Sequence, residues 1–311
     1  MKNIITYKRI SSDYENVCYV NSIFALFLYL YINQGDKNTL FVSHTDFEVL
    51  LKASQLNNVI IVDTKLNNNW DSLAYKFGAL KYDISEFIAE KLFFGHDHLT
   101  YAFLFDLENG SILEDGIGNY AGPIPLSKQF KRAIKGRVID PLGYSNTIKS
   151  VYLSKPSQVD KKLVDKLISF DIKEMLKHSR DQGLSLIIPN HRVKSFENKN
   201  ILFTQPISEM GLVSEQEKIS LYKTIIDNNQ ISIIKPHPRD YTNYENFFNC
   251  EVINKSIPAE TLIGPEDINI KLFTLNSTSL YNLQEVNSNI EVNLLVSDLH
   301  QYLVNWKANR S

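Results

Sequence analysis

The sequence predicts an α/β protein built from two doubly wound parallel sheets. Short apolar runs typical of buried strands alternate with segments of helical spacing through both halves of the chain. A stretch rich in proline and glycine, residues 121–157, separates the two series. Because 311 residues allow two domains of ~150 residues each, we expect domains at residues 1–150 and 151–311, with their sheets facing each other across a cleft.

The composition is that of an ordinary globular protein, with 43% hydrophobic and 22% charged residues and a net charge of −2. This balance argues against nucleic acid as the main partner. Cys18 and Cys250 give neither a disulfide framework nor a metal-ligand spacing, which favours a reducing cytoplasm. The apolar run at residues 23–32 is too short to span a bilayer and follows Asp13 and Glu15, so we expect a buried helix and no export signal.

In the first half, the near-continuous apolar run at residues 58–63 is typical of a strand buried on both faces. Asp46 is a first-turn acid or cap for the helix that follows it. Residues 108–110 form a tight turn between two strands. The same patterns predict strands at residues 3–10, 39–43, 58–63, 100–106 and 111–113, and helices at residues 14–33, 46–56 and 69–94.

The connecting stretch at residues 121–157 contains several prolines and glycines and a basic cluster. We expect a short helix inside an interdomain connection. Its basic residues are interpreted as a solvated helix face, with contact to anionic lipid headgroups as the alternative. They are Lys128, Lys131, Arg132, Lys135 and Arg137.

In the second half, Ser214 and Glu217 have capping-box spacing before a helix. Pro258 stands at the first turn of another. The patterns predict strands at residues 184–188, 201–204, 231–234, 251–254, 268–275 and 290–296. They predict helices at residues 158–178, 241–248, 258–263, 277–283 and 298–309, besides the one after Ser214.

A histidine between two prolines follows the apolar run at residues 231–234. Pro236 and Pro238 cannot continue a strand ladder, so they hold His237 in a stiff loop at the end of a strand. Ligands of open α/β sheets bind beyond such strand ends. An imidazole beside Arg239 suits an anionic ligand, whereas the alternative is a structural histidine in a proline-rich turn.

Glu114, Asp115 and Gly116 follow the strand at residues 111–113. Adjacent buried carboxylates raise each other's pKa, so that one can act as a general base. Gly116 permits a backbone conformation closed to other residues, although Asp-Gly is also a common turn dipeptide. His96 and His98 have a ligand-like spacing, but no nearby Cys or His completes a set, and we expect structural or surface roles for them.

A third polar stretch, Ser277, Thr278 and Ser279, follows the strand at residues 268–275. Hydroxyls at a helix start, together with free backbone N–H groups and the helix dipole, make a phosphate site that needs no metal. The alternative is that one hydroxyl simply caps the helix.

Together these stretches resemble the acidic-Gly, His-Pro and Ser/Thr motifs of bacterial sialyltransferases. The setting of His237 between Lys235-Pro236 and Pro238-Arg239 is most similar to glycosyltransferase family 52, as are Thr-Gln-Pro at 204–206 and Ile-Pro-Ala-Glu at 257–260. That family includes lipooligosaccharide and O-antigen sialyltransferases. The resemblance spans residues 3–280 and implies a GT-B fold, CMP-sialic acid as donor, inversion at the anomeric carbon and no metal or other cofactor.

The resemblance also implies roles for single residues. Asp115, in an acceptor-side first domain, is the general base, with Glu209 in residues 206–211 as the alternative. His237 faces the donor phosphate as general acid or cation. The other donor contacts expected in the second domain are Lys235, Pro236, Pro238, Arg239, Glu260, Ser277, Thr278 and Ser279.

The expected function is therefore an inverting, metal-independent sialyltransferase. Its partners are CMP-sialic acid and a glycan acceptor, free or lipid-linked, with terminal galactose as the expected acceptor sugar. We expect it in the cytoplasm or peripherally at the inner face of the membrane, as a monomer or homodimer. The alternatives are transfer of another CMP-activated keto-acid sugar such as Kdo, extension of a polysialic chain, and a non-catalytic binding protein of the same fold.

Overall fold

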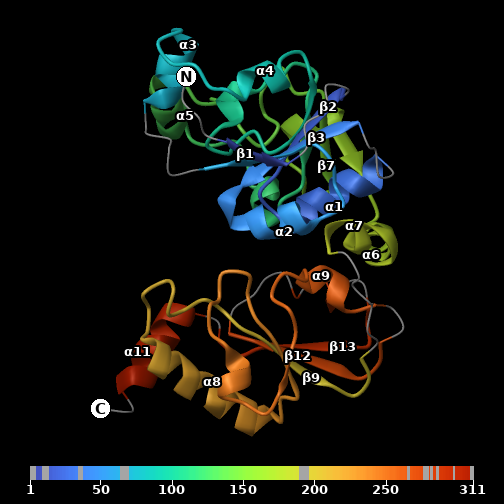
Figure 1. The fold of residues 1–311 in the computed structure, drawn as a ribbon, viewed down its shortest axis with the longest axis vertical. Coiled ribbons are helices and arrows are strands. Elements are labelled where there is room, and N and C mark those ends of the chain that lie inside the picture. The colour runs from blue at the N-terminus through green and yellow to red at the C-terminus, as the bar shows by residue number, and fades with distance from the viewer. Residues whose placement is uncertain are drawn as a thin grey trace. The chain divides into compact units, whose positions relative to one another are not determined.

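The computed structural model describes residues 5–8, 14–33, 38–63, 70–188, 196–264, 267–275, 280, 283–284, 287–296 and 298–308 (Figure 1). The chain divides into two compact units, residues 1–191 and residues 192–311. Each unit contains one sheet with helices packed around it. The α/β class expected from the alternation is confirmed, with parallel strands dominating both sheets.

The sheet of the first unit has the strand order β1-β4-β3-β2-β5-β6-β7-β8 among the described residues. Its β1 pairs antiparallel with β4, and the other seven strands run parallel. The order reverses between β2 and β5, which makes this point the switch point of the sheet. The strands are β1 (Ile5–Lys8), β2 (Asn16–Tyr19), β3 (Thr39–His44), β4 (Val59–Val62), β5 (Leu92–Gly95), β6 (Ser111–Leu113), β7 (Ser150–Leu153) and β8 (Leu167–Ser169).

The core of the first unit contains two apolar elements, strand β4 and helix α1, whose residues are largely buried. All four residues of β4 are buried, as expected for a parallel strand with both faces covered. Helix α1 (Ile23–Ile32) begins where the hydroxyl of Ser22 accepts a hydrogen bond from the Ala25 N–H at 3.3 Å. Residues 24–30 are buried on all sides, so the expected core helix is confirmed. Within the described residues, we find no helix long and apolar enough to cross a bilayer.

The remaining helices of the first unit are short and lie along the chain between the strands (Figure 1). They are α2 (Glu48–Ala53), α3 (Asp71–Lys76), α4 (Ser85–Ile88), α5 (Leu126–Ile134), α6 (Ile172–His178) and α7 (Leu184–Ile187).

The second unit has a fully parallel sheet in the order β11-β10-β9-β12-β13, counted over the described residues. Its order reverses between β9 and β12. The strands are β9 (Asn200–Phe203), β10 (Ile233–Lys235), β11 (Glu251–Val252), β12 (Ile270–Thr274) and β13 (Ile290–Leu294), and the helices are α8 (Glu215–Asn229), α9 (Ala259–Leu262) and α11 (Leu299–Ala308).

Helix α8 begins with the expected capping box. The Ser214 hydroxyl accepts from the Glu217 N–H at 3.2 Å, and the Glu217 carboxylate accepts from the Ser214 N–H at 2.7 Å. Leu221, Tyr222 and Ile225 then pack into one core cluster with residues of β9, β10 and β12. The capping prediction is confirmed, and α8 becomes the fixed element behind the loop that follows β10.

Several predicted elements are wrong. The expected helix at residues 14–33 begins with strand β2, and the one at residues 69–94 ends with strand β5. A short apolar run fits the repeat of a helix as well as that of a strand, so the pattern could not separate them. Residues 100–106 contain a 3₁₀ turn at Ala102–Leu104 instead of a strand, and residues 241–248 contain only the 3₁₀ turn Tyr244–Asn246. The strand expected at residues 184–188 is helix α7, which continues α6 through a π turn at Ser179–Gly183.

The segment between residues 150 and 188 belongs to the first unit. It supplies β7 and β8, which extend the first sheet beyond β6, and α6, which packs against α1. The two units therefore separate between residues 191 and 192, whereas the pattern of prolines and glycines placed the boundary at 150/151. Those prolines and glycines lie in turns inside one unit rather than in a linker.

Candidate active site

In both units, polar residues named in the sequence analysis lie directly after the carboxyl ends of strands. In the first unit, His96 follows β5 and Asp115 follows β6. In the second unit, Thr204 follows β9 and His237 follows β10. Because ligands of open α/β sheets bind beyond these ends near the switch point, each unit has a candidate site of its own.

In the first unit, Asp115 lies beside two histidines. Its Oδ2 is 3.8 Å from Nε2 of His98 and 4.0 Å from Nδ1 of His96. The imidazoles stack with their centroids 5.4 Å apart. The side chain of His96 is fully buried, whereas those of His98 and Asp115 are 30% and 26% exposed. The arrangement is a carboxylate open to solvent with a buried imidazole behind it.

The sequence has no further Cys or His near His96 and His98, and Asp115, which the fold brings beside them, was not considered as their partner. The parallel pairing of β5 with β6 aligns Phe94 with Ser111 and Gly95 with Ile112. This register brings the residues after β5 next to those after β6. Local sequence contains no signal for that register, which is why the cluster was missed.

His96 is held as a neutral imidazole. Burial lowers its pKa to about 4, although the charge of Asp115 acts in the opposite direction. Its Nδ1 lies 3.2 Å from Oδ1 of Asn21, and its Nε2 is buried without a hydrogen-bond partner in the part of the chain that the structure describes. Because the His96 ring is neutral, it does not balance the negative charge of the Asp115 carboxylate.

The same three residues also fit a metal ion. Among the residues that the structure describes, His96, His98 and Asp115 are the group whose ligand atoms lie close enough, all within 4.8 Å of one another. Imidazole nitrogen and carboxylate oxygen are ligands that zinc accepts. The cluster therefore supports two roles, a carboxylate flanked by histidines or a divalent cation site, which a chelator separates below.

Glu114 points to different partners from those of Asp115. Its carboxylate accepts hydrogen bonds from the N–H of Ser154 at 2.7 Å and from the Ser154 hydroxyl at 3.2 Å. Burial raises the pKa of Glu114, although the hydrogen bonds from Ser154 act in the opposite direction. The expected mutual effect required two buried carboxylates, but the Asp115 side chain is 26% exposed. Glu114 instead ties the end of β6 to the end of β7.

Gly116 turns the chain directly after Asp115. Its φ of 137° and ψ of −159° lie in a region that is essentially restricted to glycine. One residue earlier, the Asp115 N–H donates to Oδ1 of Asn119 at 2.7 Å. The acidic-Gly stretch thus needs its glycine for backbone conformation, which sets the direction of the Asp115 side chain.

Replacing Gly116 by alanine is expected to lower the free energy of unfolding by about 1–3 kcal/mol, the usual cost of such a strained backbone. Gly118 is the matched control, because a Cβ there would meet no atom within 4 Å and its φ is not in the strained range. The Gly118→Ala protein should unfold like the wild type. Chemical denaturation of both variants measures the difference, and equal stabilities would contradict the backbone argument.

In the second unit, His237 is fixed from two sides. Its N–H donates to the Thr204 hydroxyl at 3.3 Å, and the Arg239 N–H donates to its Nδ1 at 3.1 Å. Burial, followed by the charges of Arg239 and Lys235, lowers the pKa of His237 to about 4. In the unliganded protein, His237 is therefore neutral with its proton on Nε2, and the ring can donate one hydrogen bond.

Asp240 anchors the loop that carries His237. It accepts hydrogen bonds from the Thr204 and Tyr244 hydroxyls at 2.6 and 2.7 Å, and from Nζ of Lys218 at 3.0 Å. Both side chains of the Asp240–Lys218 pair are fully buried. Sequence reasoning missed this network. The available signal was Lys218 itself, a charged residue on the same helical face as Leu221 and Tyr222.

Glu209, the alternative base, belongs to the same network. Both of its carboxylate oxygens lie 3.0 Å from Nζ of Lys218, and Oε1 accepts from the Tyr241 N–H at 2.8 Å. Burial alone would raise the pKa of Glu209, but these hydrogen bonds lower it to about 2. Its carboxylate is ionised and already occupied by partners inside its own unit.

The other predicted donor residues have different environments. Lys235 is buried, and its Nζ donates to the carbonyls of Pro236 and Lys255 at 2.7 and 3.1 Å. Pro238 and Arg239 are exposed. The predictions for Ser277, Thr278, Ser279 and the Glu260 side chain lie outside the described residues.

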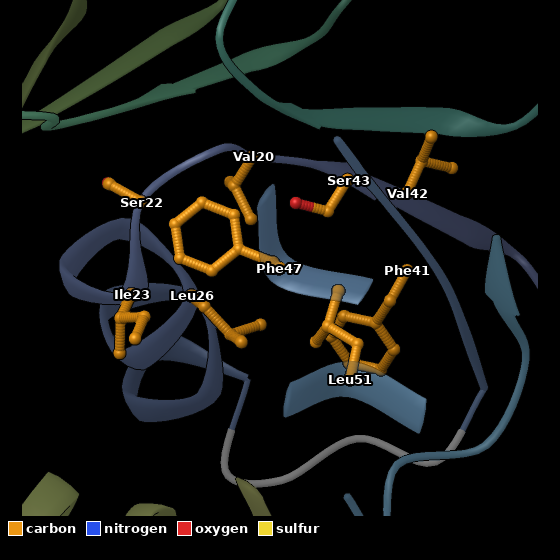
Figure 2. Close-up of a pocket in the computed structure, with 9 residues that line it drawn as sticks. All are labelled: Val20, Ser22, Ile23, Leu26, Phe41, Val42, Ser43, Phe47 and Leu51. Carbon is orange, nitrogen blue, oxygen red and sulfur yellow. The ribbon is translucent and has the colours of Figure 1, made fainter. Parts of the chain in front are cut away.

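A small apolar pocket lies near the carboxyl ends of β2 and β3 in the first unit (Figure 2). Its walls come mainly from α1, β3 and α2, and Figure 2 shows Phe47 and Leu26 on them. Val20 and Ser22, which line it, flank the Asn21 that contacts His96. Apolar walls do not suit a phosphate, so this pocket is not the site for a charged group. The lining residues are Val20, Ser22, Ile23, Leu26, Phe41, Val42, Ser43, Phe47 and Leu51.

Comparison with known proteins gives two matches. The family model described as glycosyltransferase family 52 matches residues 47–299, a range that includes Asp115, Glu209 and His237. A protein of Haemophilus influenzae, described as uncharacterized, is 32% identical over 260 residues, which cover 79% of this chain and 81% of that protein.

Proposed function

The chain belongs to glycosyltransferase family 52, and from this premise we propose that it moves sialic acid from CMP-sialic acid to a sugar hydroxyl. The observation that supports this proposal most directly is the His237 loop. A neutral imidazole, fixed through its backbone N–H and Nδ1, leaves Nε2–H free at the carboxyl end of a strand beside an exposed Arg239. That is a donor site for an anionic leaving group that needs no metal.

The proposed reaction is one in-line displacement with inversion. The acceptor oxygen attacks the anomeric carbon of the ketose while the bond from that carbon to the CMP phosphate breaks. Because the ring oxygen shares the positive charge that develops on this fully substituted carbon, the transition state has oxocarbenium character. The negative charge of the bound donor phosphate raises the pKa of the imidazole, so that His237 takes up a proton in the donor complex. This imidazolium passes its Nε2 proton to the departing phosphate and is left as a neutral ring.

We assign the acceptor side to Asp115. The base must take the proton of the attacking hydroxyl, and Asp115 is a partly exposed carboxylate beside the neutral ring of His96. In this proposal the two sheets face each other as in GT-B enzymes, so that acceptor and donor meet between them. Ser277, Thr278 and Ser279 would hold the donor phosphate and Glu260 the ribose hydroxyls, while the backbone around Lys235 and Pro236 would contact cytosine.

The proposed acceptor is terminal galactose of a bacterial surface glycan or of its lipid-linked precursor. The free thiols of Cys18 and Cys250 are compatible with action in the cytoplasm or at the inner face of its membrane. The alternatives are a Kdo-like CMP-sugar as donor, a polysialic chain as acceptor, and ligand binding without transfer.

Release of CMP from CMP-sialic acid and from CMP-Kdo, measured side by side with and without galactosides, tests the proposal. Faster turnover of CMP-sialic acid and a sialylated galactoside are expected. Preference for CMP-Kdo, or product only with a sialylated acceptor, favours one of the transferase alternatives. The absence of CMP release with retained CMP binding favours the non-catalytic alternative.

Treatment with a chelator is expected to leave the rate of transfer within about twofold of the untreated enzyme, because His237, Arg239 and a helix start replace a metal in the mechanism. The measurement is kcat after dialysis against EDTA and again after addition of Mg²⁺, Mn²⁺ or Zn²⁺. An activity that is lost and then restored by one cation would contradict the proposal. Loss of that cation's binding in His98→Ala would then identify the cluster of His96, His98 and Asp115 as its site.

A further inference from the structure

Helix α5 presents its apolar side to solvent. Leu126, Phe130 and Ile134 are spaced four residues apart and therefore lie along one face of the helix. Their exposed fractions are 80%, 68% and 43%, and α5 contains no buried residue. An apolar stripe on a helix of a globular protein normally faces the core. This stripe is turned outward, and none of the described residues of its own unit covers it.

The side of α5 toward the unit carries Arg132 and the C-terminal turn of the helix. Nε of Arg132 donates to the carbonyl of Val138 at 2.5 Å, which holds this guanidinium against the chain. Gly136 has a φ of 64° and approaches the backbone of Leu73 so closely that a Cβ would lie 3.0 Å from its nitrogen. The helix is thus fixed with Leu126, Phe130 and Ile134 pointing away from the unit.

Helix α3 adds two further exposed aromatic side chains next to α5. The hydroxyl of Ser72 in α3 donates to the carbonyl of Lys135 at the end of α5, and Figure 1 shows the two helices side by side. Trp70 and Phe77 flank α3 at its two ends and are 57% and 80% exposed. Tryptophan is favoured at a lipid headgroup layer because its ring is apolar and its N–H is hydrated, and phenylalanine is among the apolar residues that interfacial helices bury there.

The segment that contains α5 differs in charge from the chain as a whole. Residues 121–139 contain five basic residues and no acidic residue, whereas the whole chain has a net charge of −2. Lys128 and Lys131 are exposed on α5 itself. Cations attract anionic headgroups, and an exposed apolar stripe on the same short helix can enter the boundary between headgroups and acyl chains.

We propose that α5, with the adjoining α3, docks this protein onto an anionic lipid bilayer. Leu126, Phe130 and Ile134 enter the interface, and Lys128 and Lys131 contact headgroup phosphates. Docking itself does not depend on which sugar is transferred. Only its consequence, that the enzyme works at the surface that carries a lipid-linked acceptor, rests on the proposed function.

Flotation of the full chain with vesicles tests the inference without any activity measurement. Vesicles of phosphatidylcholine with one-third phosphatidylglycerol should carry the protein, and binding should be at least about tenfold weaker to pure phosphatidylcholine or at high salt. Equal binding to both vesicle types, or binding to neither, would overturn the proposal.

Two variants separate the apolar and electrostatic contributions. The triple variant Leu126→Ser, Phe130→Ser, Ile134→Ser and the double variant Lys128→Glu, Lys131→Glu should each lose about tenfold or more of the binding to anionic vesicles. All five side chains are exposed, so circular dichroism and CMP release from the donor should stay at the wild-type level.

Matched controls come from different elements of the same unit, the 3₁₀ turn Lys161–Lys166 and strand β8. Val164 and Ile168 are 56% and 40% exposed, and Lys161 and Lys162 are exposed beside them. Val164→Ser with Ile168→Ser, and Lys161→Glu with Lys162→Glu, remove the same kinds of side chain from a surface without this helix. These variants should bind like the wild type, and an equal loss in them would show non-specific adsorption and overturn the assignment to α5.

Discussion

Replacing His237 by alanine is expected to lower kcat for transfer by about 10²-fold or more, within the usual range for loss of a general acid. The alanine protein has no Nε2–H to give to the leaving phosphate. Folding should be unaffected, because Pro236 and Pro238 remain and Asp240 still accepts from Thr204, Tyr244 and Lys218. The measurement is steady-state kcat with CMP-sialic acid, together with a thermal unfolding curve.

The glutamine variant shows which form of His237 acts. Its amide can reach the Nε2 position and donate a hydrogen bond, but it cannot transfer a proton near neutral pH. If a neutral donor is sufficient, His237→Gln should retain much more activity than His237→Ala. If the proton itself is transferred, the two variants should be equally slow. A near-normal kcat in the alanine variant would return His237 to the structural role of a turn residue.

The features that could be predicted from the sequence are those encoded by neighbouring residues. The prolines on both sides of His237 end the strand and stiffen the loop after it, whatever the position of the strand in the sheet. Ser214 and Glu217 define a helix start in the same way. Gly116 follows Asp115 because the backbone there needs a conformation that is essentially restricted to glycine. Each of these predictions required only a few adjacent positions.

The features that could not be predicted depend on contacts between distant residues. His96 meets Asp115 only because β5 and β6 pair in one particular parallel register. Lys218 meets Asp240 across 22 positions of sequence, from a helix to a loop. Residues 150–188 join the first unit because β7 and β8 find a free sheet edge beside β6. Composition identified the turns in that region but not which sheet the strands extend.

Replacing Asp115 by asparagine is expected to nearly abolish transfer, with a loss of about 10²–10⁴-fold in kcat, while CMP affinity stays within a few-fold. Asparagine keeps the shape of the side chain but cannot take the proton of the acceptor hydroxyl. Glu209→Gln should lower kcat less, because Glu209 is bound to Lys218 and the Tyr241 N–H, and its pKa of about 2 makes it a weak base. Both variants are compared by kcat and by CMP binding under the same conditions.

Stability provides the control that separates the two carboxylates. Glu209→Gln removes one ionised partner of the buried Lys218, so this protein should unfold at a lower denaturant concentration than the wild type. The Asp115 side chain is partly exposed, and its Oδ2 lies 3.8 and 4.0 Å from the two imidazoles, so Asp115→Asn should unfold almost unchanged. An inactive Asp115→Asn protein of normal stability that still binds CMP has lost chemistry rather than fold. If Glu209→Gln is the inactive variant and Asp115→Asn stays active, the base lies in the second unit, and the acidic-Gly stretch is a turn or an acceptor contact.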